Sequence, residues 1–539
     1  MSSLQNAETR NIWDTPELIC MICEFLDQKD RANMLCTSRH VFATILPIVW
    51  KDVGLQSVFH LIPGVNMRTE SQQFYSYVFD FPDSADLTRF DFYAPFIKTL
   101  QVPVICVINN LPVEWAILTS SEAIAAKPLL PNLEHLKLDT SGPVEEIHIK
   151  WLSRFLCPGL LGFEMLPVSS RSDREDYYPW LDMNTSLHLI DQLSRACPRL
   201  KLLQIFPGET SLWPSGQREM MWSRIAELQH LRSLNFSGVK VYNELLNTLG
   251  RLPHLENLSF CANKNDPVND DLPEFRVPLH VPDDSFPSLR NLYLQGLFED
   301  TMNRLFKVPV LFRRSIIVKI IFAFQPFEYR LDMTERSNTL IECLSQNSPH
   351  LEDLTIGLLG KYGCFIVTRL AVDAFRHMHL RYLSLTIVNF DSDVELEDFL
   401  ASVPHLEVLD LGLQQLEPDI FQPFGSHLPK LGLLFFGTID LENAKELLEK
   451  VEQQAASQPI VLCGQAFLEH QWRQPGVPYS PPSDESIYNV ARYILSIWPN
   501  ATYEIQRAPW NCMCHCGPDN AAVTRLNAAM ESLRATNVD

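Results

Sequence analysis

The chain has 539 residues, of which 46% are hydrophobic, and it carries a formal net charge of −21 at pH 7. This apolar content is enough for two or three packed domains or for one long repeat array, and it excludes a disordered chain. The acidic balance opposes binding to nucleic-acid phosphates and to anionic membrane surfaces, so we expect proteins as partners and neither nucleic acid nor membrane.

The sequence predicts a soluble protein of the cytoplasm, the nucleus or both. Its start, MSSLQNAETRN, is polar and has no apolar signal core, and the most hydrophobic later segment, SIIVKIIFAF, contains Lys319 and is too short for a bilayer. Thirteen cysteines, an odd number found mainly at apolar positions, are typical of reduced core thiols rather than of a disulfide framework.

The first predicted element is a helix over about 16–26, PELICMICEFL. Pro16 suits the first helical position, Glu17 complements the positive end of the helix dipole, and the Thr15 side chain can accept hydrogen bonds from the first N–H groups. At about 100° per residue, one broad apolar face forms, wider than a helix docked on one core requires. Its members are Ile19, Leu26, Ile22, Leu18, Phe25 and Met21.

Two more short helices are predicted after it. Asp27 or Asp30 can cap a second helix that carries Met34 and Leu35, and a third apolar run, VFATILPIVW, ends at Trp50. Three such short helices make a poor core on their own.

These residues resemble an F-box, in a form most similar to the F-box families expanded in mushroom-forming fungi. The stretch IWDTPELICMICEFLDQKDRANMLCTSRHVFATILPIVWKDV has Pro-Glu-Leu at the first helix, Leu-Asp at its end, a Cys-Thr-Ser-Arg stretch and a closing Trp, while Thr15 stands where the family has Leu. The resemblance implies a trihelical module that binds the Skp-type adaptor of SCF (cullin-RING) ubiquitin ligases. The residues that would build or present the adaptor surface are Pro16, Leu18, Ile19, Ile22, Leu35 and Trp50. The alternative is a helical cap that protects the first unit of whatever follows.

A unit of the form Pro-x-Leu-x-x-Leu-x-Leu recurs along the rest of the chain. Clear copies begin at Pro131, Pro158, Pro198, Pro253, Pro287, Pro349, Pro404 and Pro429, and weaker copies begin at Pro95, Gln229, Ser315 and Met378. Most copies follow an amphipathic stretch, so each unit is predicted to be a helix, a tight turn at Pro and a short strand whose alternate apolar residues enter a shared core.

The repeated unit resembles the leucine-rich repeat, and the turns at Cys157-Pro158 and Cys197-Pro198 look like the form common in F-box proteins. The predicted fold class is therefore α/β. A flexible N-terminus at 1–9 precedes the trihelical F-box at 10–55. Irregular leucine-rich repeats at 56–440 form a horseshoe with parallel strands inside and helices outside, and a capping region at 441–539 closes the array, because each repeat needs a neighbour to cover its apolar face.

Target contacts are expected on residues that point away from this core. In each strand the residue between the second and third consensus Leu does so, which gives the row Gln101, Lys137, Glu164, Gln204, Asn235, Ser259, Tyr293, Ile321, Thr355, Ser384, Asp410 and Phe435. Tyr293 and Phe435 are candidate target-binding residues because exposed aromatics anchor interfaces. Tyr177, Tyr178 and Trp180 are further candidates, in the insertion SSRSDREDYYPW. A solvated strand face and a tolerated loop are the respective alternatives.

Near the C-terminus, IDLENAKELLEKVEQQ is predicted to be a charged helix and ESIYNVARYILSIWPNATYEI a helix, a turn at Pro and a strand. The run CMCHC suggests a metal site, but on an extended strand Cys512, Cys514 and Cys516 share one face and His515 lies on the other. In addition, no second Cys/His pair occurs at the spacing of a zinc finger. Incidental cysteines are favoured, so no metal or other cofactor is expected. A labile metal or redox site is the alternative.

No catalytic signature is present: the sequence has no nucleophile elbow, no His-Glu-x-x-His and no dinucleotide fingerprint. The chain is therefore predicted to be no enzyme but a substrate-recognition subunit. Its F-box would bind a Skp-type adaptor and, through it, a cullin-RING ligase, and its repeats would bind an unknown target protein. The alternative is a leucine-rich scaffold outside any ubiquitin ligase, and a third candidate is a metal- or redox-sensing protein that uses 512–516.

Overall fold

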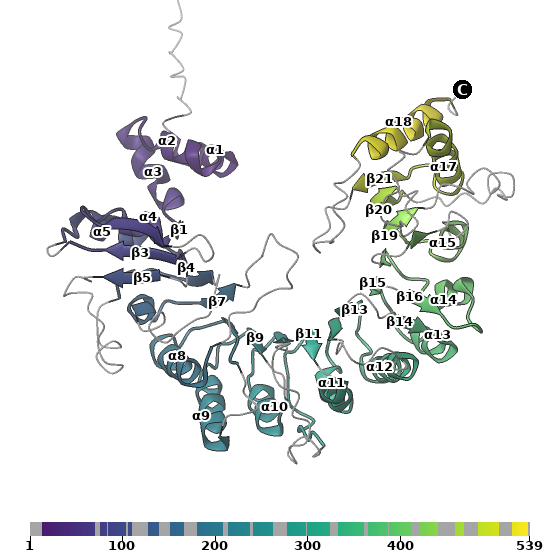
Figure 1. The fold of residues 1–539 in the computed structure, drawn as a ribbon, viewed down its shortest axis with the longest axis horizontal. Coiled ribbons are helices and arrows are strands. Elements are labelled where there is room, and N and C mark those ends of the chain that lie inside the picture. The colour runs from purple at the N-terminus through teal and green to yellow at the C-terminus, as the bar shows by residue number, and fades with distance from the viewer. Residues whose placement is uncertain are drawn as a thin grey trace, which may run out of the picture. The chain divides into compact units, whose positions relative to one another are not determined.

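The computed structural model divides into two compact units, Met1–Ser237 with Leu252–His254, and Gly238–Arg251 with Leu255–Asp539. Figure 1 labels the elements along the chain. The structure describes residues 13, 15–70, 76–82, 85–103, 106–109, 128–139, 151–166, 181–208, 214–237, 241–261, 278–297, 299–323, 333–359, 365–385, 388–411, 415–416, 421–439, 459–467, 483–505 and 520–536.

The first unit begins with the three predicted helices, α1 (Pro16–Phe25), α2 (Gln28–Met34) and α3 (Arg39–Val49). Asp27 caps α2 by accepting from the Asp30 N–H at 2.8 Å, and Ser38 caps α3 by accepting from the Val41 N–H at 3.2 Å. The capping role predicted for the Thr15 side chain is wrong. Its ψ of 100°, against 168° and 159° at the two capping residues, does not bring its hydroxyl to the free N–H groups of α1.

A small core joins these helices. Four buried residues form it, Ile19 and Cys23 of α1 with Val41 and Ile45 of α3, and Met34, Leu35, Ile48 and Val49 pack at its margin. Arg31 of α2 closes the end of α1, because its guanidinium donates to the carbonyls of Cys23 at 2.8 Å and Glu24 at 3.0 Å. The core thus uses only one stripe of α1.

A series of parallel strands runs through the rest of the first unit. They pair in chain order as β1 (Asp52–Gly54), β4 (Thr99–Pro103), β6 (His135–Asp139), β7 (Gly162–Leu166), β8 (Leu202–Ile205) and β9 (Ser233–Ser237). The helical segments between them are α4 (Leu55–Phe59), α5 (Thr88–Tyr93), η2 (Ala94–Phe96), η4 (Trp151–Phe155), α8 (Met183–Ala196) and α9 (Ser215–Ala226). A separate small sheet pairs β2 (Asn66–Glu70) with β3 (Ser76–Asp80), and β3 with β5 (Cys106–Asn109).

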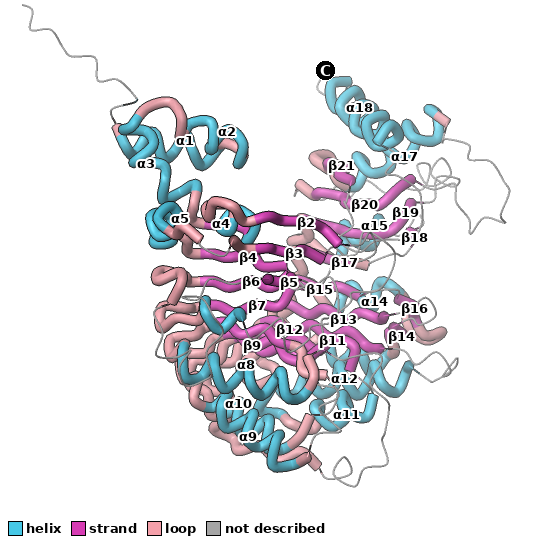
Figure 2. Tube along the Cα trace, turned by 60° about the vertical axis from the view of Figure 1, so that its left-hand side comes forward, coloured by secondary structure: helices cyan, strands magenta, loops and turns pink. Residues whose placement is uncertain are grey.

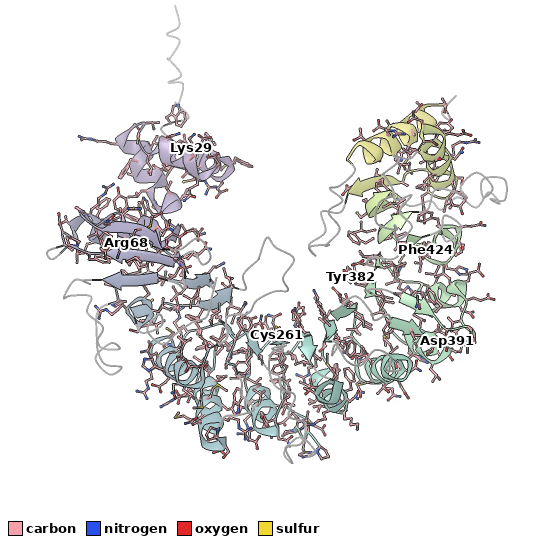
Figure 3. The ribbon with its side chains drawn as sticks, in the orientation of Figure 1. Lys29, Arg68, Cys261, Tyr382, Asp391 and Phe424 are labelled. Carbon is pink, nitrogen blue, oxygen red and sulfur yellow. The ribbon has the colours of Figure 1, made fainter. Side chains whose placement is uncertain are left out.

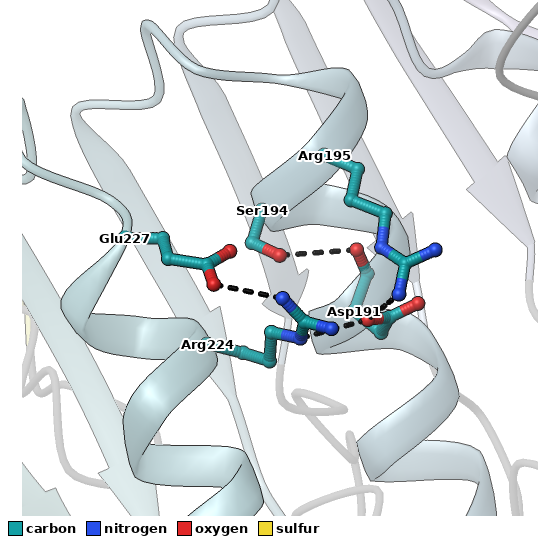
Figure 4. A network of polar contacts seen from close by, with 5 residues as sticks. All are labelled: Asp191, Ser194, Arg195, Arg224 and Glu227. Atoms are coloured by element: carbon teal, nitrogen blue, oxygen red, sulfur yellow. Dashed lines mark hydrogen bonds and ion pairs between the residues drawn. The ribbon is translucent and has the colours of Figure 1, made fainter.

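Helices α8 and α9 are joined by the polar contacts drawn in Figure 4. The Arg224 guanidinium of α9 lies 2.9 Å from Asp191 of α8 and 2.7 Å from Glu227, and Arg195 lies 2.8 Å from the same aspartate. These pairs are partly exposed to solvent, so each adds little to stability. Only the Arg224–Asp191 pair links the two helices, and the other two pairs are local.

The second unit repeats the same arrangement. Its parallel strands pair in the order β10 (Asn257–Cys261), β11 (Asn291–Leu297), β12 (Ile317–Ala323), β13 (Asp353–Leu359), β15 (Tyr382–Leu385), β17 (Val408–Asp410), β19 (Leu433–Ile439), β20 (Val461–Phe467) and β21 (Thr502–Ile505). Two short additions are β14 (Phe365–Val367) paired with β16 (Val388–Phe390), and β18 (Gln415–Leu416) paired with β19.

Helices lie along one side of these strands, as the cyan and magenta tubes of Figure 2 show. In the second unit they are α10 (Asn243–Gly250), α11 (Glu299–Phe306), η7 (Pro309–Leu311), α12 (Met333–Asn347), α13 (Arg369–Phe375), α14 (Leu396–Ser402), α15 (Phe421–His427), α17 (Asp484–Ile497) and α18 (Asn520–Thr536). No helix in the described parts of the chain is long and apolar enough to cross a membrane.

The leucine-rich α/β repeat predicted from the sequence is confirmed. Every copy of the repeated unit, clear or weak, places a strand in one of the two sets, and consensus residues such as Leu136, Leu258 and Leu354 have no exposed surface. Each contributes roughly 1.5–3 kcal/mol when fully buried. Between repeats, one carbonyl accepts two successive N–H groups, as the Glu256 carbonyl does from Arg290 at 2.9 Å and Asn291 at 3.0 Å.

One assignment in the predicted row is wrong. The residue of β12 that pairs with Tyr293 on one side and Thr355 on the other is Lys319, and Ile321 is buried beside Gln295. The repeat at this point is shifted by two residues relative to the sequence match. A two-residue shift keeps the alternation of inward and outward side chains, so the apolar pattern does not reveal it.

The C-terminal part contains the predicted helix, turn and strand as α17 and β21. The strand β20 precedes them without the Pro-x-Leu signature, and the helix predicted in IDLENAKELLEKVEQQ lies outside the described residues. Asn527 of α18 accepts from the Tyr503 N–H at 3.2 Å and donates to its carbonyl at 2.8 Å. This helix therefore pairs polar backbone groups of the last strand.

Candidate protein-interaction surfaces

The first candidate surface is the α1 apolar face, which we define as Leu18, Met21, Ile22 and Phe25. Their exposed fractions are 40%, 55%, 36% and 88%. Leu18 lies three and four residues before Met21 and Ile22, and Phe25 lies four and three residues after them, so the four form one stripe. The buried Ile19 and Cys23 form the other stripe, which faces α3. Helix α1 thus has two apolar stripes, and its neighbours cover only one.

The six residues predicted for adaptor binding separate into two groups in the structure. Pro16, Leu18 and Ile22 are exposed along α1, whereas Ile19 is fully buried and supports the helix from behind. Leu35 packs at the margin of the small core. Met21 and Phe25 complete the α1 apolar face, and the helical periodicity that placed them beside Ile22 was the signal for them.

Trp50, the last of the six, is half-buried at the end of α3. Its ring centroid lies 4.5 Å from that of Tyr93 in α5, at an interplanar angle of 38°. This contact joins the end of α3 to helix α5 of the same unit. In the structure Trp50 therefore positions the helices on the repeats that follow.

The second candidate surface is the strand face of the second unit, on the side of the strands away from the helices. Two adjacent rows of side chains lie on it in register. One row is Asn257, Asn291, Ile317, Asp353, Tyr382, Val408, Leu433, Val461 and Thr502, and the other is Ser259, Tyr293, Lys319, Thr355, Ser384, Asp410, Phe435, Cys463 and Glu504. The predicted contacts Tyr293 and Phe435 are both half-buried on this face.

The polar centre of this face is Asp353. Tyr382 is its direct partner on β15, while Lys319 and Tyr293 lie on β12 and β11. Burial raises the pKa of the Asp353 carboxyl to about 6, and the nearby Lys319 only partly offsets this effect. Burial also raises the pKa of Tyr382 to about 12, with the charge of Asp410 as a further cause. Figure 3 labels Tyr382 on the strand side of this unit.

We expect Asp353→Asn to stabilise the protein at neutral pH. Because the folded pKa lies above the ordinary value of 3.8, the charged carboxylate opposes folding once the pH exceeds about 6, and protonation removes this effect as the pH falls towards 3.8. Solvent screens the half-buried site, so the expected gain in unfolding free energy at pH 7 is about 1 kcal/mol. Denaturant unfolding of both proteins at several pH values measures it. An equal stability difference at pH 7 and pH 3.8 would contradict the assignment.

In the corresponding row of the first unit, two residues form an ion pair and a third bonds to the backbone. Lys137 lies 3.6 Å from Glu164, and the Gln204 side-chain amide donates to the Met165 carbonyl at 2.7 Å. Gln101 is exposed and Asn235 half-buried in the same row. This row has no aromatic side chain and is the less distinctive of the two strand faces.

Two predicted sites lie outside the described residues: the aromatic insertion with Tyr177, Tyr178 and Trp180, and the run Cys512 to Cys516. Within the described ranges, no three His, Cys, Asp or Glu side chains are grouped so as to hold a metal ion. The cysteines that the structure describes are free thiols. Burial raises the pKa of Cys343 to about 11, so this thiol stays protonated at neutral pH.

Comparisons with known proteins add only distant likenesses. No protein-family model matches the chain, and no curated protein matches it. Among solved structures, the chain resembles TLR13 in a complex with ssRNA13, at 14% identity over 69% of this chain and 45% of that chain, with a TM-score of 0.33. It also resembles the leucine-rich repeat-containing protein LegL7 from Legionella pneumophila, at 10% identity over 84% of this chain and 98% of that one, with a TM-score of 0.25.

The chain spans less than half of the TLR13 chain. At such TM-scores neither likeness contributes to the assignment of fold or function, which rests on strand register, burial and the two surfaces described above. The chain is built from leucine-rich α/β repeats, preceded by three helices, one of which exposes an apolar face.

Proposed function

We propose that the chain is the substrate-recognition subunit of an SCF-type ubiquitin ligase. In this proposal the α1 apolar face binds a Skp-type adaptor, which connects the chain to a cullin-RING ligase, and the strand faces of the repeats bind a target protein. Its partners are proteins of the cytoplasm or the nucleus.

The exposed α1 apolar face is the observation that supports this proposal most. A helix that served only to cap the first repeat would bury its large apolar side chains against that repeat. Instead Phe25 and Met21 are more than half exposed, although the same helix contributes Ile19 and Cys23 to a closed core. Burial of apolar surface contributes about 25 cal/mol per Å², so a partner that covers this stripe gains a large favourable contribution to its binding free energy.

The proposed mechanism is proximity. In this proposal the chain holds the target near a ubiquitin-conjugating enzyme, which carries out the chemistry, and so raises the effective concentration of the reacting groups. Rigid repeats suit this role because each strand is held in register by its neighbours. The chain is accordingly proposed to be no enzyme and to need no cofactor.

The second candidate function is a leucine-rich scaffold that binds a partner without a ubiquitin ligase. Thr15 favours it, since this polar residue stands where the F-box resemblance places Leu, next to the exposed Pro16 and Leu18. One large apolar side chain is thereby missing from the proposed adaptor contact. The choice depends on whether the four residues of the α1 apolar face bind the adaptor without it.

Hydrogen exchange of the full chain, with and without a purified Skp-type adaptor, tests the proposed contact. We expect the adaptor to slow exchange of backbone amides in α1 and α2, because binding removes these helices from water and suppresses their local opening. Amides of β13 and β15 should exchange at unchanged rates. If exchange became slower in the repeats while the exchange rates in α1 stayed unchanged, the proposed contact would be contradicted.

A further inference from the structure

The strand face around Asp353 carries an unusual arrangement of charge. Among the described residues, the Asp353 carboxylate makes no hydrogen bond or ion pair, although Asp353 is itself half-buried. The neighbouring Asp410, by contrast, accepts a hydrogen bond from the Ser384 hydroxyl at 3.0 Å. A half-buried carboxylate without a partner opposes folding, so its presence calls for a function other than stability.

Two tyrosines lie on this face near the carboxylate, Tyr382 on the adjacent strand and Tyr293 two strands away. Tyr382 is its register partner on β15, and Tyr293 lies within the range of its charge, since Asp353 contributes to the raised pKa of that phenol. Both rings are half-buried and present part of their surface on the strand side. Tyrosine faces attract a cation placed over them, and a carboxylate beside the rings supplies its counter-charge.

The charges of the whole face have one dominant sign. The described outward residues of β10 to β21 include three carboxylates, Asp353, Asp410 and Glu504, and one ammonium, Lys319. This balance suits a positively charged partner and disfavours a phosphorylated or acidic one. Lys319 is the basic group that competes with such a partner.

We infer that this part of the strand face binds a basic segment of the target protein, with an arginine or lysine side chain paired with Asp353 and lying against Tyr382 and Tyr293. The inference rests on the proposed function, because it names the chemistry of the target that the repeats hold. The site, which we call the Asp353 site, consists of Tyr293, Lys319, Asp353 and Tyr382.

Fluorescence anisotropy with labelled peptide pools tests the Asp353 site in the full chain. The pools are short, degenerate and free of histidine, and differ only in one fixed central residue: arginine, lysine, glutamine or glutamate. We expect the arginine and lysine pools to bind more tightly than the other two. Asp353→Asn should weaken binding of the arginine pool about tenfold, which corresponds to about 1.4 kcal/mol of binding free energy.

Matched variants separate the site from general charge effects. Asp393→Asn removes the same charge at an exposed turn of the same unit, and Tyr488→Ala removes an exposed tyrosine of α17, so both should bind like the wild type. Tyr382→Ala should weaken binding, and Lys319→Gln should strengthen it by removing the competing cation. Binding of the arginine pool should fall as the pH decreases through about 6 in the wild type and not in Asp353→Asn, because protonation removes the counter-charge.

Three results would overturn the inference: preferential binding of the glutamate pool, no binding of any pool, or equal losses of arginine-pool affinity in Asp353→Asn and Asp393→Asn. The same preparations are mixed with the Skp-type adaptor. If the adaptor binds and the peptides do not, the Asp353 site is wrong while the ligase proposal stands. If the peptides bind and the adaptor does not, the ligase proposal is wrong and the Asp353 site stands.

Discussion

The double substitution Leu18→Asp with Ile22→Asp should abolish binding of a Skp-type adaptor while leaving the chain folded. Both side chains are exposed in the free protein, so aspartate at these positions meets water and does not disturb the core of Ile19, Cys23 and Val41. In the complex the two carboxylates would be buried without partners, which costs several kcal/mol. A pull-down measures binding, and circular dichroism confirms that helical content is unchanged.

The matched control for this variant is Leu370→Asp. Leu370 is an exposed leucine on α13, so the substitution makes the same chemical change in a helix that is not proposed to bind the adaptor. It should leave adaptor binding at the wild-type level. If the double variant bound as well as this control, the α1 apolar face would not be the contact.

Trp498→Ala should have the largest effect on stability. The indole is almost completely buried after α17, and its ring centroid lies 6.0 Å from that of Phe421 in α15. Truncation of a buried Trp removes its apolar contacts and leaves a cavity, which costs about 3–5 kcal/mol. Denaturant unfolding of the full chain measures the loss as a lower midpoint.

Trp13→Ala provides the comparison for that substitution, since Trp13 is an exposed tryptophan near the start of the described residues. Its unfolding midpoint should stay close to that of the wild type. Equal midpoints for the two variants would show that α15 and α17 do not pack through Trp498, contrary to the structure.

The repeats were predictable from the sequence because their signal is local. Pro at the turn and apolar residues at alternate strand positions, as in PHLENLSF before Asn263, fix both the strand and its buried side. The signal fails where it is ambiguous. The two-residue shift at Lys319 preserves the alternation, and β20 lacks the Pro-x-Leu signature of the clear copies.

The candidate surfaces were only partly predictable. The apolar periodicity of α1 showed that the helix has more apolar surface than a core needs, but Ile19 and Ile22 are equivalent in that pattern. Only the position of α3 decides that Ile19 is buried and Ile22 exposed. Thr15 likewise has a suitable side chain for capping and an unsuitable ψ.

Asp353 could not be found from the sequence at all. It stands at a strand position where a polar residue is ordinary, directly after Leu351 and Glu352 of a consensus repeat. Its properties come from Tyr382 and Lys319, which belong to other repeats and lie beside it only through strand pairing. Burial and missing partners are properties of the folded chain, so this site required the structure.

Isothermal titration of the folded wild-type chain with a purified Skp-type adaptor measures the proposed adaptor binding itself. We expect heat of binding with one adaptor per chain, since the α1 apolar face is a single surface. Absence of binding, by a chain shown to be folded by circular dichroism, would contradict the ligase proposal and leave a leucine-rich scaffold with a helical N-terminus.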